Sequence, residues 1–148
     1  MDFTQKQIEF LEKNHGAGMS SLRKDGSAHI VRIGVAMVNG KLQSSGTQER
    51  MRTKQLRRDP RSTLFVFEQG YGFLSVEANV TILEGPDAPQ LNLELFRVMQ
   101  KGMPQPPEAG MIIWQGKPIT EAEFLKAMVD EHRLVYQFEP TRIYGMVL

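Results

Sequence analysis

Two short turn signals in the first third of the chain constrain its fold most strongly. Lys24-Asp25-Gly26-Ser27 and Asn39-Gly40 separate three segments, 17–23, 28–38 and 41–46, that are rich in alternating or β-branched residues. An Asn-Gly pair favours the type I′ turn that joins antiparallel strands. Turns this short leave no room for crossover helices, which disfavours a parallel doubly wound sheet. The sequence therefore predicts an antiparallel meander.

Further helices and strands are predicted around this meander. An amphipathic helix with Thr4 as its N-cap and Gly16 as its stop is expected to cover one end of the sheet. A second helix is predicted over 48–58, ended by Asp59-Pro60 because the residue before proline disfavours the α region. The remaining predictions are strands at 62–68 and 71–84 with a bulge at Ala78-Asn79, helices at 87–101 and 121–133, a loop at 102–118, and one or two closing strands over 134–138 and 143–148.

These elements predict a single domain over residues 1–148. A chain of 148 residues that is 41% hydrophobic has the length and the apolar content for one compact core. Six strands, mostly joined by hairpins, with helices after the third and fifth, describe a mainly β (α+β) fold. We expect a six-stranded antiparallel split β-barrel with peripheral helices, although other sheet-plus-helix arrangements remain open.

Composition narrows the function classes. The chain has no cysteine, which excludes disulfides, thiolate metal sites and a cysteine nucleophile, and suits a reducing cytoplasm. Its first twenty residues include five charged ones and no apolar core region, and no stretch of 18 apolar residues occurs, so neither a signal peptide nor a membrane span is expected. The common nucleotide-binding, metalloprotease and serine-hydrolase motifs are missing, and His15, His29 and His132 have no ligand spacing. We therefore expect no metal site, and a bound cofactor could supply the chemistry.

Positive charge is concentrated on one predicted helix. The formal net charge is only +1, yet six of the 18 basic residues lie between Arg50 and Arg61, with one acidic residue among them. The preceding strand ends in Ser45-Gly46-Thr47, and cations follow in the first turns of the helix. Hydroxyl groups, a glycine that permits close approach, unpaired helix N–H groups and the forked guanidiniums of Arg50 and Arg52 together favour a phosphate site.

The basic helix also has two interpretations that involve no phosphate cofactor. Arg50, Lys54, Arg57 and Arg61 fall within an arc of about 60°, and a solvated charged face accounts for this stripe equally well. Nucleic-acid binding by the stripe is a further class. The window lacks the interleaved aromatic residues that stack on bases, and a pI of about 8.0 is low for such modules.

A family resemblance supports the phosphate interpretation. It is carried by the hairpin pair 22–31, the strand 42–47, the helix motif Arg50-x-Arg52-Thr53-Lys54-x-Leu56-Arg57-Arg58-Asp59-Pro60 and the strand 62–67. Their order resembles the pyridoxamine 5′-phosphate oxidase-like superfamily of flavin and deazaflavin split β-barrels. The basic helix is most similar to the group that uses coenzyme F-420, a deazaflavin with a phosphate and a polyglutamate tail. The match covers roughly residues 5–85 and, loosely, the C-terminal strand.

The resemblance implies particular site residues. It places the cofactor phosphate at Ser45, Arg50 and Arg52, the last standing where the superfamily commonly has lysine. It also implies a homodimer with the cofactor at the subunit interface, where aromatic residues of the partner cover the ring; the candidates are Tyr71, Phe73 and Trp114, which ordinary packing would account for equally well. The full expected cofactor-binding set is Val31, Arg32, Ile33, Gly34, Ser45, Gly46, Thr47, Arg50, Arg52, Thr53, Lys54 and Tyr71.

The cofactor expected from these residues is F-420, with FMN as the alternative. A polyglutamate tail adds carboxylates that would run along Lys54, Arg57 and Arg58, whereas FMN ends at its phosphate. The expected reaction is hydride transfer from the reduced deazaflavin to a small electron-poor acceptor. Tyr71 and Tyr144 are weak candidates for a proton donor. An FMN-dependent oxidase or reductase and a non-catalytic flavin-binding carrier remain as alternatives, and the physiological substrate is left open.

Overall fold

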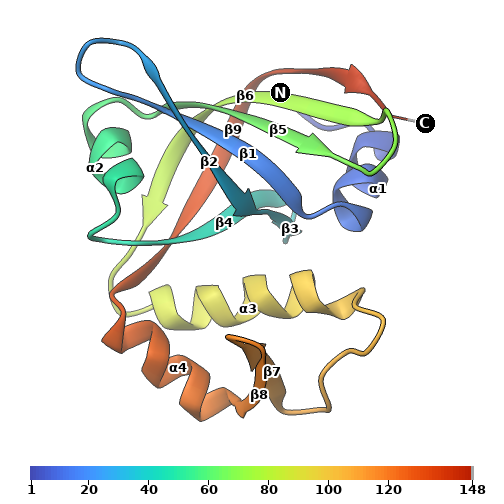
Figure 1. Ribbon diagram of the computed structural model, residues 1–148, viewed down its shortest axis with the longest axis vertical. Coiled ribbons are helices and arrows are strands. Elements are labelled where there is room, and N and C mark those ends of the chain that lie inside the picture. Colours follow the sequence, from blue (N-terminus) through green and yellow to red (C-terminus); the bar gives the residue numbers. More distant parts are fainter. Residues whose placement is uncertain (148) are drawn as a thin grey trace.

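The computed structural model describes residues 1–147, so Leu148, in the predicted closing strand, lies outside the described residues (Figure 1). The elements in order are α1 (Gln5–Lys13), β1 (Gly16–Leu22), β2 (Ala28–Gly34), β3 (Ala36–Val38), β4 (Lys41–Thr47), α2 (Met51–Arg58), β5 (Arg61–Phe67), β6 (Phe73–Leu83), α3 (Ala88–Lys101), β7 (Met111–Trp114), β8 (Lys117–Thr120), α4 (Glu121–Asp130) and β9 (Arg133–Met146). The mainly β fold with peripheral helices is confirmed.

The main sheet has seven antiparallel strands rather than the predicted six. Its order is β2-β1-β5-β6-β9-β4-β3. The prediction was wrong because the segment 28–38 divides at Val35 into two strands, β2 beside β1 and β3 beside β4, at opposite edges of the sheet. The sheet curls until these edges approach each other, and the Ser44 hydroxyl in β4 donates a 2.7 Å hydrogen bond to the Gly34 carbonyl at the end of β2. One residue thus links the two sides of the split.

Local sequence explains how these elements begin and turn. Thr4 caps α1 in a reciprocal capping box with Gln7, as its position before the apolar stripe predicted. Asn39 and Gly40 have φ angles of 50° and 78°, the left-handed conformation that a type I′ turn requires. The inward side chains of alternating strand residues form the barrel core, to which α1 contributes Phe10 and Leu11. The two predicted hairpins, β1-β2 and β3-β4, are therefore present, but they lie at opposite edges of the sheet and do not form one continuous meander.

The longest strand pairing, β6 with β9, contains the irregularity predicted for the 71–84 strand. The register shifts between Glu77 and Ala78, which pair with Arg142 and Pro140 respectively. The additional residue is therefore Thr141 in β9, not a residue at Ala78-Asn79 in β6. A proline cannot donate to the ladder, which makes its neighbourhood a common place for a bulge.

Helices α3 and α4 form a small module with the hairpin β7-β8, beside the barrel (Figure 1). Most of the hairpin falls within the segment 102–118, for which the sequence predicts a loop. Its strands Met111–Trp114 and Lys117–Thr120 are only four residues long, too short for periodicity to identify them. The module has its own apolar cluster of Leu93, Ile112, Phe124 and Met128. Through residue 147, no helix is both long and apolar enough to cross a bilayer.

Candidate functional site

A pocket of about 280 Å³ lies where the split of the barrel meets α3. The barrel contributes the end of β2, the middle of β4 and the start of β9, while α2 and α3 close the sides. Three arginines from three different elements surround it. The lining residues are Arg32, Ile33, Gly34, Ser44, Ser45, Arg52, Phe96, Met99 and Arg133.

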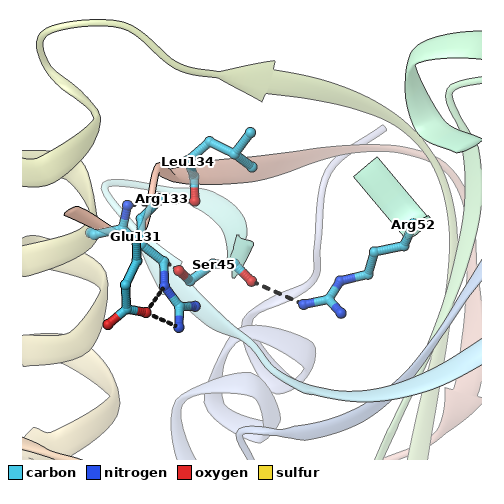
Figure 2. Close-up of polar contacts among 6 residues, drawn as sticks. Ser45, Arg52, Glu131, Arg133 and Leu134 are labelled. Atoms are coloured by element: carbon cyan, nitrogen blue, oxygen red, sulfur yellow. Dashed lines mark hydrogen bonds and ion pairs between the residues drawn. The ribbon is translucent and has the colours of Figure 1, made fainter. Parts of the chain in front are cut away.

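Arg52 contributes a partly buried guanidinium to this pocket. Helix α2 begins at Met51, three residues later than predicted, so Arg52 stands in its first turn and extends back toward β4 (Figure 2). Its Nη2 donates one long hydrogen bond of 3.5 Å to the Ser45 carbonyl, and its guanidinium carbon lies 5.7 Å from the centre of the Tyr136 ring. Its Nε is fully buried and has no hydrogen-bond partner within the described chain.

The charge of Arg52 is poorly compensated. Burial lowers the pKa of Arg52 below its ordinary value, and the nearby positive charges of Arg50 and Arg133 lower it further. No carboxylate forms an ion pair with Arg52 in residues 1–147. A partly buried cation with an orphaned donor and cationic neighbours is a site that an anion would stabilise.

Arg133, at the start of β9, is the second cation directed at this region. Its Nε and Nη2 donate hydrogen bonds of 3.1 and 2.8 Å to the same oxygen of Glu131. Its guanidinium carbon also lies 5.1 Å from the ring centre of Trp114. Figure 2 shows the guanidinium groups of Arg133 and Arg52 on either side of Ser45. The side chain of Arg133 is only 14% exposed, so its position is well defined by packing.

Ser45 is oriented by a buried amide. Its hydroxyl donates a 2.5 Å hydrogen bond to Oδ1 of Asn92 in α3. The Nδ2 group of Asn92 donates to the carbonyls of Ala88 and Leu134, which fixes the orientation of the amide. With its one proton engaged, the Ser45 hydroxyl presents lone pairs rather than a donor to the pocket. In this arrangement the arginines, not Ser45, supply the hydrogen-bond donors for an anion.

Gly46, Thr53 and Tyr136 form a packed support behind Arg52. The fully buried Tyr136 ring lies so close to Gly46 that any Cβ at this position would overlap it. Thr53 donates a 2.6 Å hydrogen bond to the Thr47 carbonyl, and its oxygen accepts a hydrogen bond from the Tyr136 hydroxyl. Gly46 therefore makes room for a tyrosine, and the hydroxyl of Thr53 is used inside the fold.

The remaining predicted site residues are distributed unevenly. Arg32, Ile33 and Gly34 line the pocket, whereas Val31 packs against the barrel core. Residues elsewhere in the predicted set lie away from the pocket lining: Arg50 and Lys54 are exposed on α2, Thr47 is partly buried at the end of β4, and Tyr71 and Tyr144 are 88% and 49% exposed.

The aromatic candidates belong to two different regions. Phe73 stacks on Phe65 with ring centres 5.3 Å apart, on the outer face of the barrel. Trp114 packs edge-to-face against Phe96 and Phe124 at 5.5 Å each, inside the α3–α4 module. Trp114 does not line the pocket itself, but it contacts two residues that do, Phe96 and Arg133.

Much of the predicted basic stripe is engaged in internal contacts. Arg57 forms a two-bond ion pair with Glu84 at 2.7 and 2.9 Å, and Arg61 pairs with Asp59 at 2.8 Å. Arg58 donates to the Leu22 carbonyl. Arg50 and Lys54 remain without an ion-pair partner within residues 1–147.

Sequence reasoning missed three residues that shape the site: Asn92, Arg133 and Tyr136. Each lies more than 30 positions from the Ser45–Arg52 segment, and the topology alone brings them close. Arg133 could have been noticed as a cation at the start of a predicted strand next to the Glu131 carboxylate. In residues 1–147, no group of three or more His, Cys, Asp or Glu side chains could hold a metal ion.

Comparisons with solved structures define the fold class. A conserved hypothetical protein from Mycobacterium tuberculosis superposes with a TM-score of 0.72 at 16% identity, covering 98% of this chain and 85% of that one. An F-420 reductase gives 0.63 at 18%, covering 92% and 94%. A Listeria innocua protein named for pyridoxamine 5′-phosphate oxidase gives 0.63 at 15%, covering 95% of each chain.

The protein has the pyridoxamine 5′-phosphate oxidase-like split-barrel fold. No protein-family model matches the sequence of this split barrel. A search of curated proteins also found no similar sequence. The arginine pocket of the split barrel has what a phosphate-bearing cofactor needs: convergent guanidiniums, an orphaned buried donor and an adjacent apolar surface from Phe96 and Met99.

Proposed function

We propose that this protein is an oxidoreductase that binds a phosphate-bearing deazaflavin or flavin, with coenzyme F-420 as the first candidate cofactor. The observation that carries the proposal is Arg52, a partly buried cation with a fully buried, unpartnered Nε and no carboxylate partner in the described chain. When bound, a reduced deazaflavin supplies hydride to an electron-poor alkene, imine or quinone-like acceptor.

The chain's own residues would bind and orient this cofactor. Arg52 and its cationic neighbours would hold the phosphate, and the backbone of Arg32–Gly34 is proposed to line the ring, as the family resemblance implies. Phe96 and Met99 give one side of the pocket an apolar surface, which would limit the access of water to a bound ring. Orientation of two reactants in a dry site is the main contribution that a split barrel without strong acid–base groups can make. Tyr71 and Tyr144 remain the candidate proton donors, and both are exposed in the single chain.

A homodimer is part of the proposal because the single chain leaves an apolar face uncovered. Cross-strand pairing places Phe65 beside Ser75 and Tyr144, and Phe67 beside Phe73 and Met146, on the outer face of the barrel. The large exposed apolar side chains of this outer face are Ile30, Phe65, Phe67, Tyr144 and Met146. A contiguous apolar face of this kind is typical of an interface between subunits. In such a dimer, Tyr71 is the proposed aromatic cover of the ring, as the family resemblance implies.

FMN is the second candidate cofactor, and the ion pairs of α2 favour it. Of the three residues predicted to contact a polyglutamate tail, Arg57 is already paired with Glu84 and Arg58 donates to the Leu22 carbonyl, so fewer cations are free than the sequence suggested. Arg50 and Lys54 remain available for tail carboxylates. The choice between the cofactors therefore depends on these two exposed residues rather than on the whole stripe.

Parallel calorimetric titrations of the purified protein with F-420, FMN and riboflavin test the proposal. We expect F-420 to bind more tightly than FMN, and riboflavin, which lacks the phosphate, to bind most weakly. In the Lys54→Gln variant, affinity for F-420 should fall while affinity for FMN stays constant. If FMN binds more tightly than F-420, FMN is the cofactor and the F-420 assignment is wrong. Equal affinity for FMN and riboflavin would remove the phosphate site from the proposal.

Turnover separates an enzyme from a carrier. The loaded protein is mixed with a panel of enones and quinones, and oxidation of the reduced cofactor is followed by absorbance. Turnover of at least one acceptor above the rate of free cofactor is expected. Tight binding with no turnover on any acceptor would instead indicate a cofactor carrier.

A further inference from the structure

We propose that Arg133 is the second phosphate-binding arginine of the pocket and that Trp114 and Glu131 position it for this role. This inference rests on the proposed function, because it takes the ligand to be the phosphate group of the proposed cofactor. Arg133 lies outside the Ser45–Arg52 segment that the sequence identified, and it comes from the last strand of the sheet.

Neighbouring side chains fix the guanidinium of Arg133 in place, unlike that of a mobile surface arginine. Two of its nitrogens, Nε and Nη2, are used by Glu131, and Nη1 has no hydrogen-bond partner among residues 1–147. The Trp114 ring lies against the guanidinium at 5.1 Å, and the edge-to-face contacts with Phe96 and Phe124 fix that ring in turn. Such support lets an arginine offer a hydrogen bond to a ligand without losing further side-chain freedom.

Charge within the pocket fits a phosphate. Arg32, Arg52 and Arg133 line it, and Glu131 is the carboxylate bonded to one of them, which leaves a net charge of +2. A terminal phosphate carries about −1.5 to −2 at neutral pH. Arg52 and Arg133 lie close enough for each charge to affect the other, and an anion between them would remove this repulsion. Because the Ser45 hydroxyl already donates its proton to Asn92, the arginine side chains are the hydrogen-bond donors for the phosphate.

Trp114 provides a direct assay because it is the single tryptophan of the chain. An anion that engages Arg133 will change the electrostatic field at the indole, so sodium phosphate should change Trp114 fluorescence with saturation, whereas sodium chloride at equal ionic strength should not. The Arg52→Gln variant should lose this response, although Arg52 lies over Tyr136 rather than Trp114. If calorimetry detects phosphate binding while Trp114 fluorescence stays constant, Arg133 is not part of the site. Failure of phosphate to bind at all overturns the inference as well.

Variants of Arg133 itself complete the test. Arg133→Gln should weaken phosphate and cofactor binding at least tenfold, and Arg133→Lys, which keeps the charge but loses the fork, should restore part of the affinity. Arg97→Gln is the matched control, because Arg97 is an exposed arginine that also pairs with a glutamate, Glu121, and its loss should leave affinity unchanged. Circular dichroism checks that each variant is folded. Wild-type affinity in a folded Arg133→Gln protein contradicts the proposal.

The two proposals can fail separately. A saturable response of Trp114 to phosphate, with no binding of F-420 or FMN, would uphold Arg133 as an anion ligand and reject the proposed cofactors. Tight cofactor binding that is unchanged in Arg133→Gln would uphold the proposed function and reject the second arginine.

Discussion

At the scale of single residues, Gly46 shows how a site can depend on a missing side chain. Gly46→Ala would push a methyl group into the Tyr136 ring, which has no free space to move because it is fully buried. Overpacking of this kind costs ~1–3 kcal/mol, and urea unfolding should reveal the loss. Gly102→Ala is the control, since nothing lies within 4 Å of an added Cβ there. Equal stability of the two variants would show that Tyr136 can move aside.

The Tyr136 hydroxyl gives a second prediction at this scale. Tyr136→Phe removes the hydrogen bond to Thr53 but keeps the ring against which Arg52 lies. Stability should fall by about 1 kcal/mol, the usual net value of one hydrogen bond, while affinity for the cofactor stays unchanged. A double-mutant cycle with Thr53→Val measures the coupling between the two hydroxyls. Lost cofactor affinity at unchanged stability would mean that the hydroxyl serves the ligand instead.

Individual site residues could be predicted only where they are close in sequence. Ser45 and Arg52 share one strand–helix junction, so a local pattern of hydroxyl, glycine and cations was enough to select them. The local pattern also assigned Gly46 and Thr53 to the ligand, whereas both contact Tyr136, which is more than 80 positions away. No local signal reports which residue a distant strand will place opposite a glycine.

At the scale of elements, the end of α2 is stabilised by a local charge pair. Asp59, the C-cap residue, accepts hydrogen bonds from the side chain and backbone of Arg61, which lower its pKa from 3.8 to about 2. A depressed carboxyl pKa contributes stability that is complete above pH 3.8 and is lost as the pH falls through about 2. In Arg61→Gln the pKa should rise toward its ordinary value, as carbon-13 NMR of the carboxyl group would show. An unchanged pKa would assign the shift to the backbone hydrogen bond alone.

Helices and hairpins were predicted well where periodicity or turn chemistry was strong. Local chemistry marks three element boundaries, at Thr4, Asn39-Gly40 and Asp59-Pro60. At each of them the structure has the predicted helix start, turn or helix end. The failures concern segments that only tertiary partners define. Val35 divides the segment 28–38 because the chain crosses there from one edge of the sheet to the other. The β7-β8 hairpin packs its apolar residues against α3 and α4, which no local pattern reports.

At the scale of the whole molecule, the uncovered outer face predicts self-association. Phe65 lies near the centre of this face and is 48% exposed in the single chain. Phe65→Glu would place a carboxylate among apolar side chains, so sedimentation analysis should find a dimer for the wild type and a monomer for the variant. Val129→Glu, at an exposed valine on α4, should remain dimeric. A monomeric wild type would end the proposal of a shared cofactor site.

The strand order also determines when the sheet can be completed during synthesis. Among the strands of residues 1–147, β9 is made after the others, and it is the strand that joins β6 to β4. Until it enters, the β3-β4 hairpin has no other neighbour in the sheet, although it was translated about ninety residues earlier. Ser45 and Arg52 therefore leave the ribosome long before the strand that brings Arg133 beside them. A nascent chain that stops before residue 133 carries the recognisable basic motif but lacks Arg133 and the strand that completes the pocket, so ligand binding depends on the synthesis of β9.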